Sequence, residues 1–208
     1  LILFGMQGAG KGTLGKSLAD RYKMEIFETG GELRKLSQQD SELAKKVKNI
    51  IEAGHLVPNE VVMEIVENFM NNLPENTSVL FDGIPRKVDQ ANSLNAVLKK
   101  NNRNFKAVLI EIKKETALKR LTQRRICGVC KNVYPVDYSQ SKCNCGGELT
   151  TRTDDNPEAI KTRLEAFENE TVPSINLYSE NLLKIDGEPN IEEVKNLAFE
   201  TLDPIMAA

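Results

Sequence analysis

A glycine-rich stretch near the start of the chain has the residue types that bind phosphate. The segment GMQGAGKGT covers residues 5–13, directly after the apolar run LILFG and directly before a helix-like run. Glycines let several backbone N–H groups approach one phosphate, the following helix adds partial positive charge, and Lys11 adds a full charge. Gly12 separates this lysine from the hydroxyl of Thr13, whereas Ser or Thr follows directly in the usual P-loop. The pattern indicates an NTPase or a kinase without deciding which.

All cysteines of the chain occur in one polar stretch, as a CxxC pair followed by a CxC pair. In a reducing compartment such clusters favour metal binding over disulfides. Two chelating pairs of soft ligands predict a structural, tetrahedral Zn²⁺ site, and a short polar segment gains stability from one. Two alternatives stay open, namely reduced thiols without metal and a disulfide formed on oxidation. The predicted ligands are Cys127, Cys130, Cys143 and Cys145.

Several basic residues could neutralise two phosphorylated substrates. Phosphoryl transfer requires both anions in line with water excluded, and a chain of net charge −2 needs a local basic cluster for this. Arginine suits the task because its planar fork pairs with two phosphate oxygens. A single arginine is most often a solvated surface charge, but the candidates lie in or near motifs. They are Lys11, Arg34, Arg86, Arg124, Arg152 and Arg163.

The elements that position these residues are predicted from short apolar runs in the sequence. Buried strands are predicted at 1–5, 24–27, 78–83, 105–112 and 182–187. The segments between them have helical patterns, for example 11–22 and 58–70. Strands that alternate with helices predict an α/β fold with a doubly wound, five-stranded parallel sheet and helices on both faces. The polar region from about 122 to 156 breaks this pattern and predicts an insertion.

The bulk composition narrows the class of protein. A chain of 208 residues with 40% hydrophobic residues fits one core domain that carries insertions. A net charge of −2 does not favour nucleic acid or an anionic membrane as a partner. The sequence has no apolar run near the ~18 residues of a membrane span and no signal-peptide pattern. We therefore expect a cytoplasmic protein that binds neither membrane nor nucleic acid.

Three further motifs follow the P-loop in order: ETGGELR at 28–34, LFDGIPR at 80–86 and TTRTDDNPEAIKTRL at 150–164. Together with the GKGT variant of the P-loop, they closely resemble the adenylate kinase family of nucleoside monophosphate kinases, over essentially the whole chain. The cysteines fall where long-lid bacterial members carry a structural zinc. The resemblance implies an enzyme that catalyses ATP + AMP ⇌ 2 ADP with Mg²⁺. We expect a monomer, because moving domains leave little room for a large fixed interface.

The resemblance also implies an organisation into a core and two mobile parts. The core would comprise 1–27, 58–119 and 157–208. A helical AMP-binding insertion would cover 28–57, and a lid would cover 120–156. Both mobile parts would close over the substrates and exclude water.

Roles for individual residues follow from the same resemblance. Asp82 would act on the water shell of Mg²⁺, and Asp154 and Asp155 would organise the closed lid. The donor ATP would contact Gly8, Ala9, Gly10, Lys11, Gly12, Thr13, Arg120, Arg124, Val133, Tyr134 and Pro189. The acceptor AMP would contact Thr29, Gly30, Arg34, His55, Leu56, Val57, Gly83, Ile84, Pro85, Arg86, Gln90, Arg152 and Arg163. The catalytic set would be Lys11, Arg86, Arg124, Arg152 and Arg163.

This chain departs from the family pattern at several positions. The second cysteine pair is CxC instead of CxxC, which bears on metal occupancy. Gln7 replaces a usual proline of the P-loop, and Ile84 replaces a frequent phenylalanine. Gly31 stands where an aspartate commonly follows the Thr-Gly pair, and Glu28 stands where small polar residues are common. These changes bear on the acceptor preference.

Other functions stay open as alternatives. A GTP:AMP phosphotransferase would use the same motifs, because lid contacts to the donor base are mostly backbone. A UMP/CMP kinase would more often have a short lid, which this chain lacks. From a different class, a non-catalytic nucleotide- and zinc-binding module would bind without turnover.

Overall fold

The structure is a computed structural model, and it describes residues 1–134 and 138–206. Residues 135–137 of the expected lid and 207–208 of the expected core therefore lie outside the described residues. Within the described part, two sheets are present, a large parallel one and a small antiparallel one.

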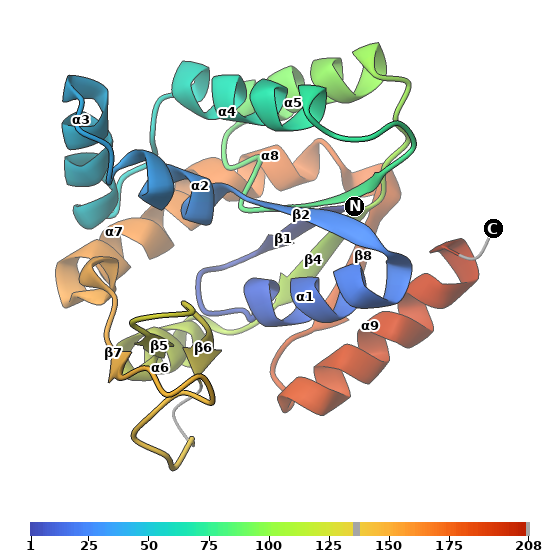
Figure 1. The fold of residues 1–208 in the computed structure, drawn as a ribbon. Coiled ribbons are helices and arrows are strands. Elements are labelled where there is room, and N and C mark those ends of the chain that lie inside the picture. Colours follow the sequence, from blue (N-terminus) through green and yellow to red (C-terminus); the bar gives the residue numbers. More distant parts are fainter. Residues whose placement is uncertain (135–137, 207–208) are drawn as a thin grey trace.

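The large sheet has five parallel strands in the order β2-β3-β1-β4-β8 (Figure 1). The strands β2 and β3 end together at the paired residues Glu28 and Asp82. On the other side Asp82 pairs with Leu3, so β1 continues two residues beyond that level to Gly5. The carboxyl ends of the central strands therefore share one edge, where open α/β sheets bind ligands. The sheet confirms the predicted fold class and all five predicted strands: β1 (Ile2–Gly5), β2 (Met24–Glu28), β3 (Ser78–Asp82), β4 (Ala107–Glu111) and β8 (Leu182–Asp186).

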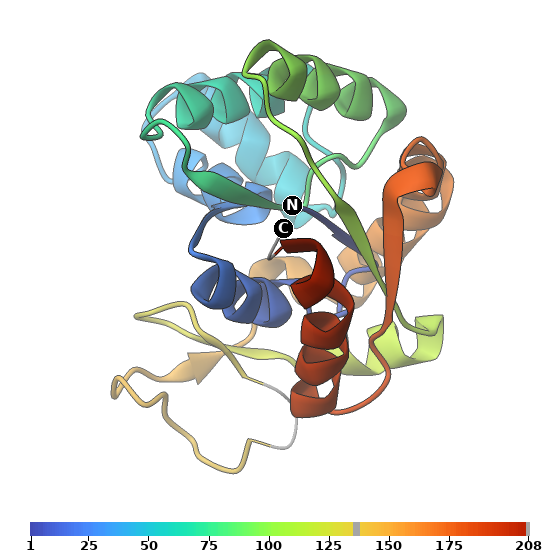
Figure 2. The same ribbon diagram turned by 90° about the vertical axis from the view of Figure 1, so that its right-hand side faces the viewer.

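Helices cover both faces of this sheet, as predicted. One face packs against α4 (Asn59–Asn71), α5 (Val88–Lys100) and α8 (Val172–Asn176). The other packs against α1 (Lys11–Tyr22) and α9 (Ile191–Met206), which run side by side (Figure 2). No helix in the described part of the chain combines the length and the apolar character that a membrane crossing needs.

The two layers draw on alternate residues of the strands. Phe4 packs into the cluster below α4 and α5, whereas its neighbour Leu3 packs into the cluster with α1 and α9. This alternation follows from the two-residue period of a strand. Both side chains are almost fully buried, so β1 is packed on both faces.

The segment between β2 and α4 folds as two helices, α2 (Thr29–Leu36) and α3 (Glu42–Glu52). The start of α3 is encoded locally, because the Ser41 hydroxyl accepts a hydrogen bond from Ala44 N at 3.0 Å and an acid lies in the first turn. These helices occupy the predicted insertion 28–57.

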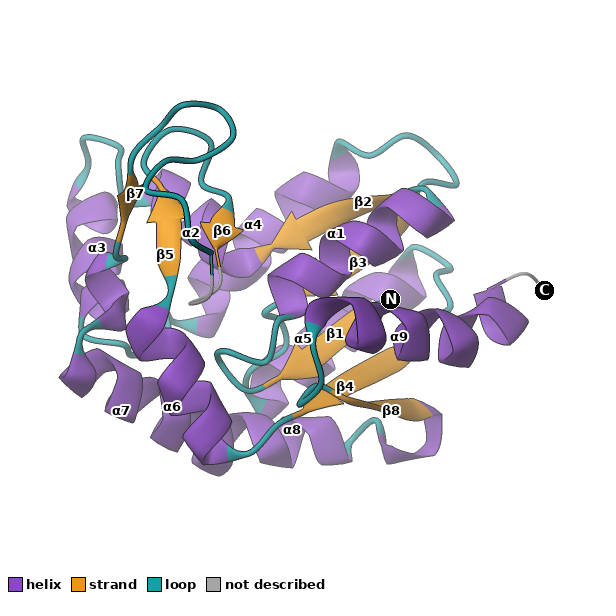
Figure 3. Ribbon diagram, turned by 90° about the horizontal axis from the view of Figure 1, so that it is seen from below, coloured by secondary structure: helices purple, strands orange, loops and turns teal. Residues whose placement is uncertain are grey.

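The cysteine-rich region forms a small antiparallel sheet in the order β6-β5-β7, apart from the large sheet (Figure 3). Its strands are β5 (Arg125–Cys127), β6 (Val133–Tyr134) and β7 (Leu149–Thr150). The sequence predicted no strands here, because strands of two or three residues are too short for a periodic signal. The helix before them, α6 (Lys114–Gln123), continues through residue 120, where the lid was predicted to begin.

A helical segment returns the chain from the small sheet to the core. It begins with a 3-10 turn, η1 (Thr153–Asp155), and continues as α7 (Pro157–Ala166). Asn156 caps α7, accepting a hydrogen bond from Ala159 N at 2.9 Å, and Pro157 takes the first helical position. A π-helical turn (Phe167–Thr171) then leads into α8, and a 3-10 turn (Ser179–Asn181) precedes β8.

Candidate nucleotide site and cysteine cluster

The predicted phosphate loop connects β1 to α1. Gly10 is the N-cap of α1 with a φ of 91°, a conformation that glycine adopts without strain. Its carbonyl accepts hydrogen bonds from Thr13 N at 3.0 Å and Leu14 N at 2.9 Å. The Lys11 ammonium donates to the Gly5 carbonyl at 2.7 Å. The loop thus presents residues 8–13 around a helix N-terminus, an arrangement that binds phosphate.

A lysine and a carboxyl face each other beside this loop. Burial lowers the pKa of Lys11 to about 8, Asp82 opposes the shift, and three nearby arginines reinforce it. Burial raises the pKa of Asp82, and Lys11 opposes that shift in turn. A Cβ atom on Gly12 would lie 3.9 Å from Asp82 Oδ2, so the carboxyl faces the phosphate loop. Asp82 therefore lies beside the phosphate loop.

Three arginines converge on two aspartates of η1. Arg124 donates to both carboxylate oxygens of Asp155, at 2.8 and 2.5 Å, and Arg163 donates to the same carboxylate at 3.0 Å. Arg163 also donates to the Asp154 carbonyl at 2.9 Å. Arg152 makes a two-point ion pair with the Asp154 carboxylate. These pairs organise the arginines into one cluster.

The cluster carries excess positive charge. Burial lowers the pKa of Arg163 to about 10. The charges of Arg152 and Arg124 also lower this pKa, whereas the carboxylates of Asp154 and Asp155 act to raise it. The side chain of Asp155 is 2% exposed, so it is well shielded from water. A polyanion entering this region would relieve the repulsion among the arginines.

One pocket collects most of the predicted AMP residues. It holds about 580 Å³ of space, including its open mouth. Ile84 and Pro85 are buried and are not among its lining residues. The predicted residues that line it are Thr29, Gly30, Arg34, His55, Leu56, Val57, Gly83, Arg86, Gln90, Arg152 and Arg163.

Two buried polar side chains of this pocket differ in their partners. The Thr29 hydroxyl is buried and, among the described residues, has no hydrogen-bond partner. The Gln90 side-chain oxygen accepts a hydrogen bond from Arg86 N at 2.9 Å. An unsatisfied buried hydroxyl is costly, so Thr29 offers its hydroxyl to a ligand in the pocket.

Arg86 is held by one local contact and by one contact from a distant part of the chain. Its Nε donates to the Gly83 carbonyl at 2.9 Å, and its own carbonyl accepts from the Thr171 hydroxyl at 3.1 Å. Thr171 lies in the π-helical turn before α8, and sequence reasoning missed it. Its local sequence carries no signal for this role, because the contact depends on how α7 and α8 return to the core.

Of the residues predicted to border the donor base, the structure brings together only Arg120 and Pro189. Arg120 donates to the Glu188 carbonyl at 3.2 Å, next to Pro189. The Glu188 carboxylate accepts from Lys113 N at 2.5 Å and the Thr116 hydroxyl at 2.8 Å, which ties the β8–α9 loop to α6. Glu188 was also missed by sequence reasoning.

The other two predicted donor-site residues belong to the small sheet. Val133 is 49% exposed. Tyr134 is buried, and its hydroxyl donates to Cys143 Sγ at 2.9 Å. Tyr134 is therefore part of the packing around the cysteines in this structure.

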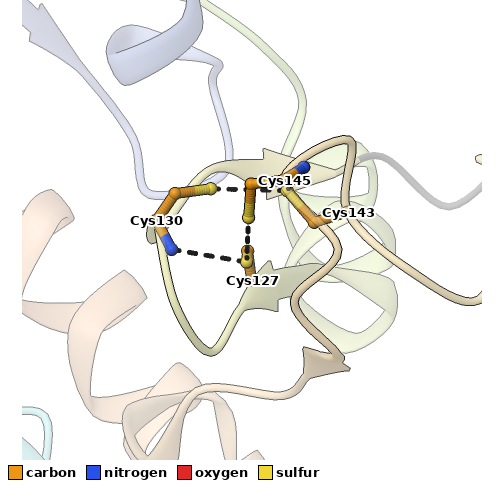
Figure 4. A group of neighbouring side chains, drawn as sticks. All are labelled: Cys127, Cys130, Cys143 and Cys145. Atoms are coloured by element: carbon orange, nitrogen blue, oxygen red, sulfur yellow. Dashed lines mark hydrogen bonds between the residues drawn. The ribbon is translucent and has the colours of Figure 1, made fainter.

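The cysteines form one compact group (Figure 4). All four Sγ atoms lie within 4.8 Å of one another, and two pairs are 3.3 and 3.5 Å apart. A tetrahedral zinc with Zn–S bonds of about 2.3 Å holds its sulfurs about 3.8 Å apart. The sulfurs of the CxC pair lie in the same compact group as those of the CxxC pair, and the geometry fits Zn²⁺.

Backbone N–H groups favour the thiolate form of two of these cysteines, Cys127 and Cys143. Against one backbone hydrogen bond, the Cys143 thiol raises the pKa of Cys130 to about 12. The pKa of Cys143 falls to about 6, because Cys145 N and the Tyr134 hydroxyl donate hydrogen bonds to its sulfur. A Cβ atom on Gly147 would lie only 2.6 Å from Cys127 Sγ, so only glycine allows this close approach. Thiolates are the form that binds metal.

The residues present also fit magnesium. Mg²⁺ prefers carboxylate oxygens and phosphate oxygens and keeps several waters. Asp82 offers a carboxyl at the sheet edge beside the phosphate loop. It could hold the water shell of a metal that bridges nucleotide phosphates and neutralises their charge.

Comparison with known proteins agrees with this geometry. A sequence model of the family described as "Adenylate kinase" matches residues 3–183. Among similar proteins, an adenylate kinase from Alkaliphilus oremlandii is 40% identical over 202 residues, covering 93% of this chain and 94% of the relative. One from Kosmotoga olearia is 38% identical, and one from Staphylococcus epidermidis is 35% identical, each covering 98% of both chains.

The match spans the phosphate loop, the pocket and the cysteine cluster. Identity at this level over nearly the full chain shows membership of the family. The chain therefore belongs to the adenylate kinase family of phosphotransferase enzymes.

Proposed function

We propose that the protein catalyses the reversible, Mg²⁺-dependent reaction ATP + AMP ⇌ 2 ADP. One observation carries the proposal: the lysine of the phosphate loop and the predicted arginines converge on one region, where burial and neighbouring positive charges lower the pKa values of Lys11, Arg86 and Arg163. Such a cluster, in a chain of net charge −2, suits two polyanionic substrates held together. Family membership supports the same reaction.

AMP would occupy the pocket beneath α2. The buried, unpartnered hydroxyl of Thr29 would take a hydrogen bond with the base region, and Gln90 would lie near it. The backbone at 55–57 would line the adenine. Arg34 and Arg86 would bind the AMP phosphate, each as a planar fork.

ATP would lie on the other side of the cluster. Residues 8–13 would hold its phosphates, with Lys11 on the β- and γ-phosphates. Arg120, Pro189, Val133 and Tyr134 would border its base, although Tyr134 is engaged with Cys143 in this structure. Arg124 would reach the phosphates from the lid side.

The transferring phosphoryl group would pass between Lys11 and the arginines Arg86, Arg124, Arg152 and Arg163. Asp154 and Asp155 would orient these arginines, as their ion pairs allow. This catalysis is positioning and charge stabilisation, so no protein group needs to be covalently modified.

Two metals would have different tasks. Asp82 would hold the water shell of Mg²⁺, and the metal would supply charge neutralisation to the phosphates. Cys127, Cys130, Cys143 and Cys145 would hold a structural Zn²⁺ in the lid. The zinc would stabilise the small sheet, which has little apolar core of its own.

The insertion 28–57 and the lid 120–156 would move against the core. Closure would exclude water from the reacting phosphates, and lid opening could limit turnover. We also propose that the enzyme acts as a monomer in the cytoplasm, because moving parts leave little surface for a fixed interface.

Turnover with defined nucleotides tests the proposal. ADP formation from ATP and AMP should be reversible and should require Mg²⁺. ATP and GTP should be compared at equal concentration with AMP, and UMP and CMP should be compared as acceptors. A GTP preference would identify a GTP:AMP phosphotransferase instead, and nucleotide binding without turnover would identify a binding module.

The arginine cluster can be tested by a matched pair of variants. Arg86→Ala should lower kcat about 10³-fold or more, the value of a phosphate-clamping arginine in related transfers. Arg21→Ala removes an exposed arginine that pairs with Asp203 and lies in the last turn of α1, at the opposite end of this helix from the phosphate loop, and it should leave kcat unchanged. Near-normal turnover in Arg86→Ala would contradict the role of Arg86.

A further inference from the structure

A carboxylate already holds one arginine of the proposed acceptor pocket. Glu28 ends β2, and its Oε1 accepts a hydrogen bond from Arg34 Nη2 at 2.9 Å. Glu28 is the register partner of Asp82 on β3, so it lies at the ligand-binding edge of the sheet. Its charge also reaches Arg86 and Arg152, whose pKa values it acts to raise.

The local sequence makes room for this carboxylate. A Cβ atom on Gly31 would lie 2.9 Å from Glu28 Oε2, closer than real side chains approach, and 3.5 Å from Glu28 Cδ. Any other residue at position 31 would therefore push the carboxylate away from its present place. Glu28 and Gly31 act as a pair, and both differ from the residues common in the family.

Arg34 differs from Arg152 and Arg163 in the part of the chain that supplies its carboxylate partner. Arg152 and Arg163 pair with aspartates of η1, which lies beside the lid. Arg34 and Glu28 both flank the junction of β2 and α2, six residues apart. Their side chains are 36% and 51% exposed, so the pair can open without burying an unpaired charge.

From these contacts we infer that Glu28 is a specificity-determining residue, an internal anion that competes with the acceptor phosphate for Arg34. The inference rests on the proposed function, because it assigns Arg34 to the AMP phosphate. A ligand must offer Arg34 a stronger anion than the Glu28 carboxylate. A dianionic monophosphate meets this requirement, whereas an uncharged nucleoside has no charge with which to compete for Arg34.

The direction of the effect does not depend on how Arg34 moves. If Arg34 leaves Glu28 for the phosphate, binding costs the ion pair. If Arg34 keeps both partners, the carboxylate lies close to the phosphate and repels it. In either case Glu28 weakens phosphate binding, and its neutralisation strengthens it.

The first test measures AMP and adenosine binding to Glu28→Gln by calorimetry. Glutamine keeps the size of the side chain and removes its charge. We expect AMP to bind about two- to fivefold more tightly, the range of a half-exposed ion pair, and adenosine binding to be unchanged. The control is Glu32→Gln, which removes a carboxylate on the adjoining helix α2 that pairs with Lys35 outside this pocket.

A second variant, at Gly31, tests the same Glu28–Arg34 contact by displacing the carboxylate instead of neutralising it. Gly31→Ala should displace the flexible Glu28 carboxylate and should likewise tighten AMP binding. In the double variant the two effects should not add, because the alanine acts only through the charge at position 28. Additive effects would mean that Gly31 acts by another route.

Other outcomes overturn the inference. Unchanged or weaker AMP binding by Glu28→Gln would show that Glu28 only orients Arg34. Equal tightening of AMP and adenosine would show an effect on the base site. Failure of the unaltered protein to bind AMP would instead refute the proposed function, so the two failures are distinguishable.

Discussion

Arg124 and Asp155 form a two-point ion pair, with Nε–Oδ2 and Nη2–Oδ1 distances of 2.8 and 2.5 Å. The same carboxylate accepts from Arg163 at 3.0 Å. One aspartate thus fixes the relative positions of two arginines that come from different helical segments. Since reacting phosphates must be held within a fraction of an ångström, this shared contact is central to the proposed site.

The first prediction concerns this aspartate. Asp155→Asn should lower kcat about 10²-fold, because two arginines lose their common anchor. It should also lower the free energy of unfolding by about 3 kcal/mol, as expected when one partner of a buried ion pair is removed. Steady-state kinetics and denaturant unfolding measure both. Asp203→Asn, at the exposed pair with Arg21, is the control and should leave kcat unaltered.

The second prediction concerns pH. The pKa of Lys11 is about 8 in the folded protein, below its ordinary 10.5. Charged Lys11 therefore costs stability below pH 8, and this cost disappears as the pH rises from about 8 to 10.5. Phosphate needs the charged form, so ATP affinity should fall about tenfold between pH 7 and pH 9.

Calorimetry can isolate this lysine. In buffers of different ionisation enthalpy, ATP binding near pH 8.5 should take up a proton. Lys11→Met should bind ATP weakly, without that proton uptake and without the rise in stability above pH 8. Equal proton uptake by both proteins would assign the titration to another group.

The third prediction concerns the zinc site. Protein purified without added metal should contain about one zinc per chain, and chelation should lower the melting temperature. A zinc content near zero, with four titratable thiols, would mean that the small sheet folds without metal. The kinase proposal would stand in that case.

The fourth prediction separates the cysteines from their supporting residue. Tyr134→Phe removes the hydroxyl that donates to Cys143 Sγ. The pKa of Cys143, lowered to about 6 by Cys145 N and this hydroxyl, should rise. Zinc should therefore be released at a higher pH on acid titration than from the unaltered protein. An identical release curve would show that the hydroxyl does not support the thiolate.

The fifth prediction concerns the contact between the insertion and α7. Gly54 has a φ of 80°, and a Cβ atom there would lie 2.5 Å from the Ala159 carbonyl oxygen. Gly54→Ala should lower the free energy of unfolding by about 2–4 kcal/mol, from strain and overpacking together, and should raise the KM for AMP. Gly128→Ala is the control, since its Cβ would find its nearest neighbour at 3.6 Å.

The sequence alone determined the layered core and the chemistry of its motifs. Strands, the P-loop helix and the cysteine pairs depend on residues a few positions apart, so their patterns are visible in one dimension. For example, the run before Gly5 predicted β1, and α1 begins at Lys11 as the motif requires. The arginines of the pocket were likewise predicted, because they lie in motifs.

Only the tertiary structure decided which of these groups touch. Thr171 meets Arg86 from 85 positions away, and Arg120 meets the Glu188 carbonyl from 68 positions away. Glu28 and Arg34 are close in sequence and form an ion pair. Only the register of β2 with β3 places this pair beside Asp82, at the edge of the sheet where the candidate site lies. These contacts depend on how the helices and strands pack against one another in the folded chain, and no local sequence pattern encodes that packing.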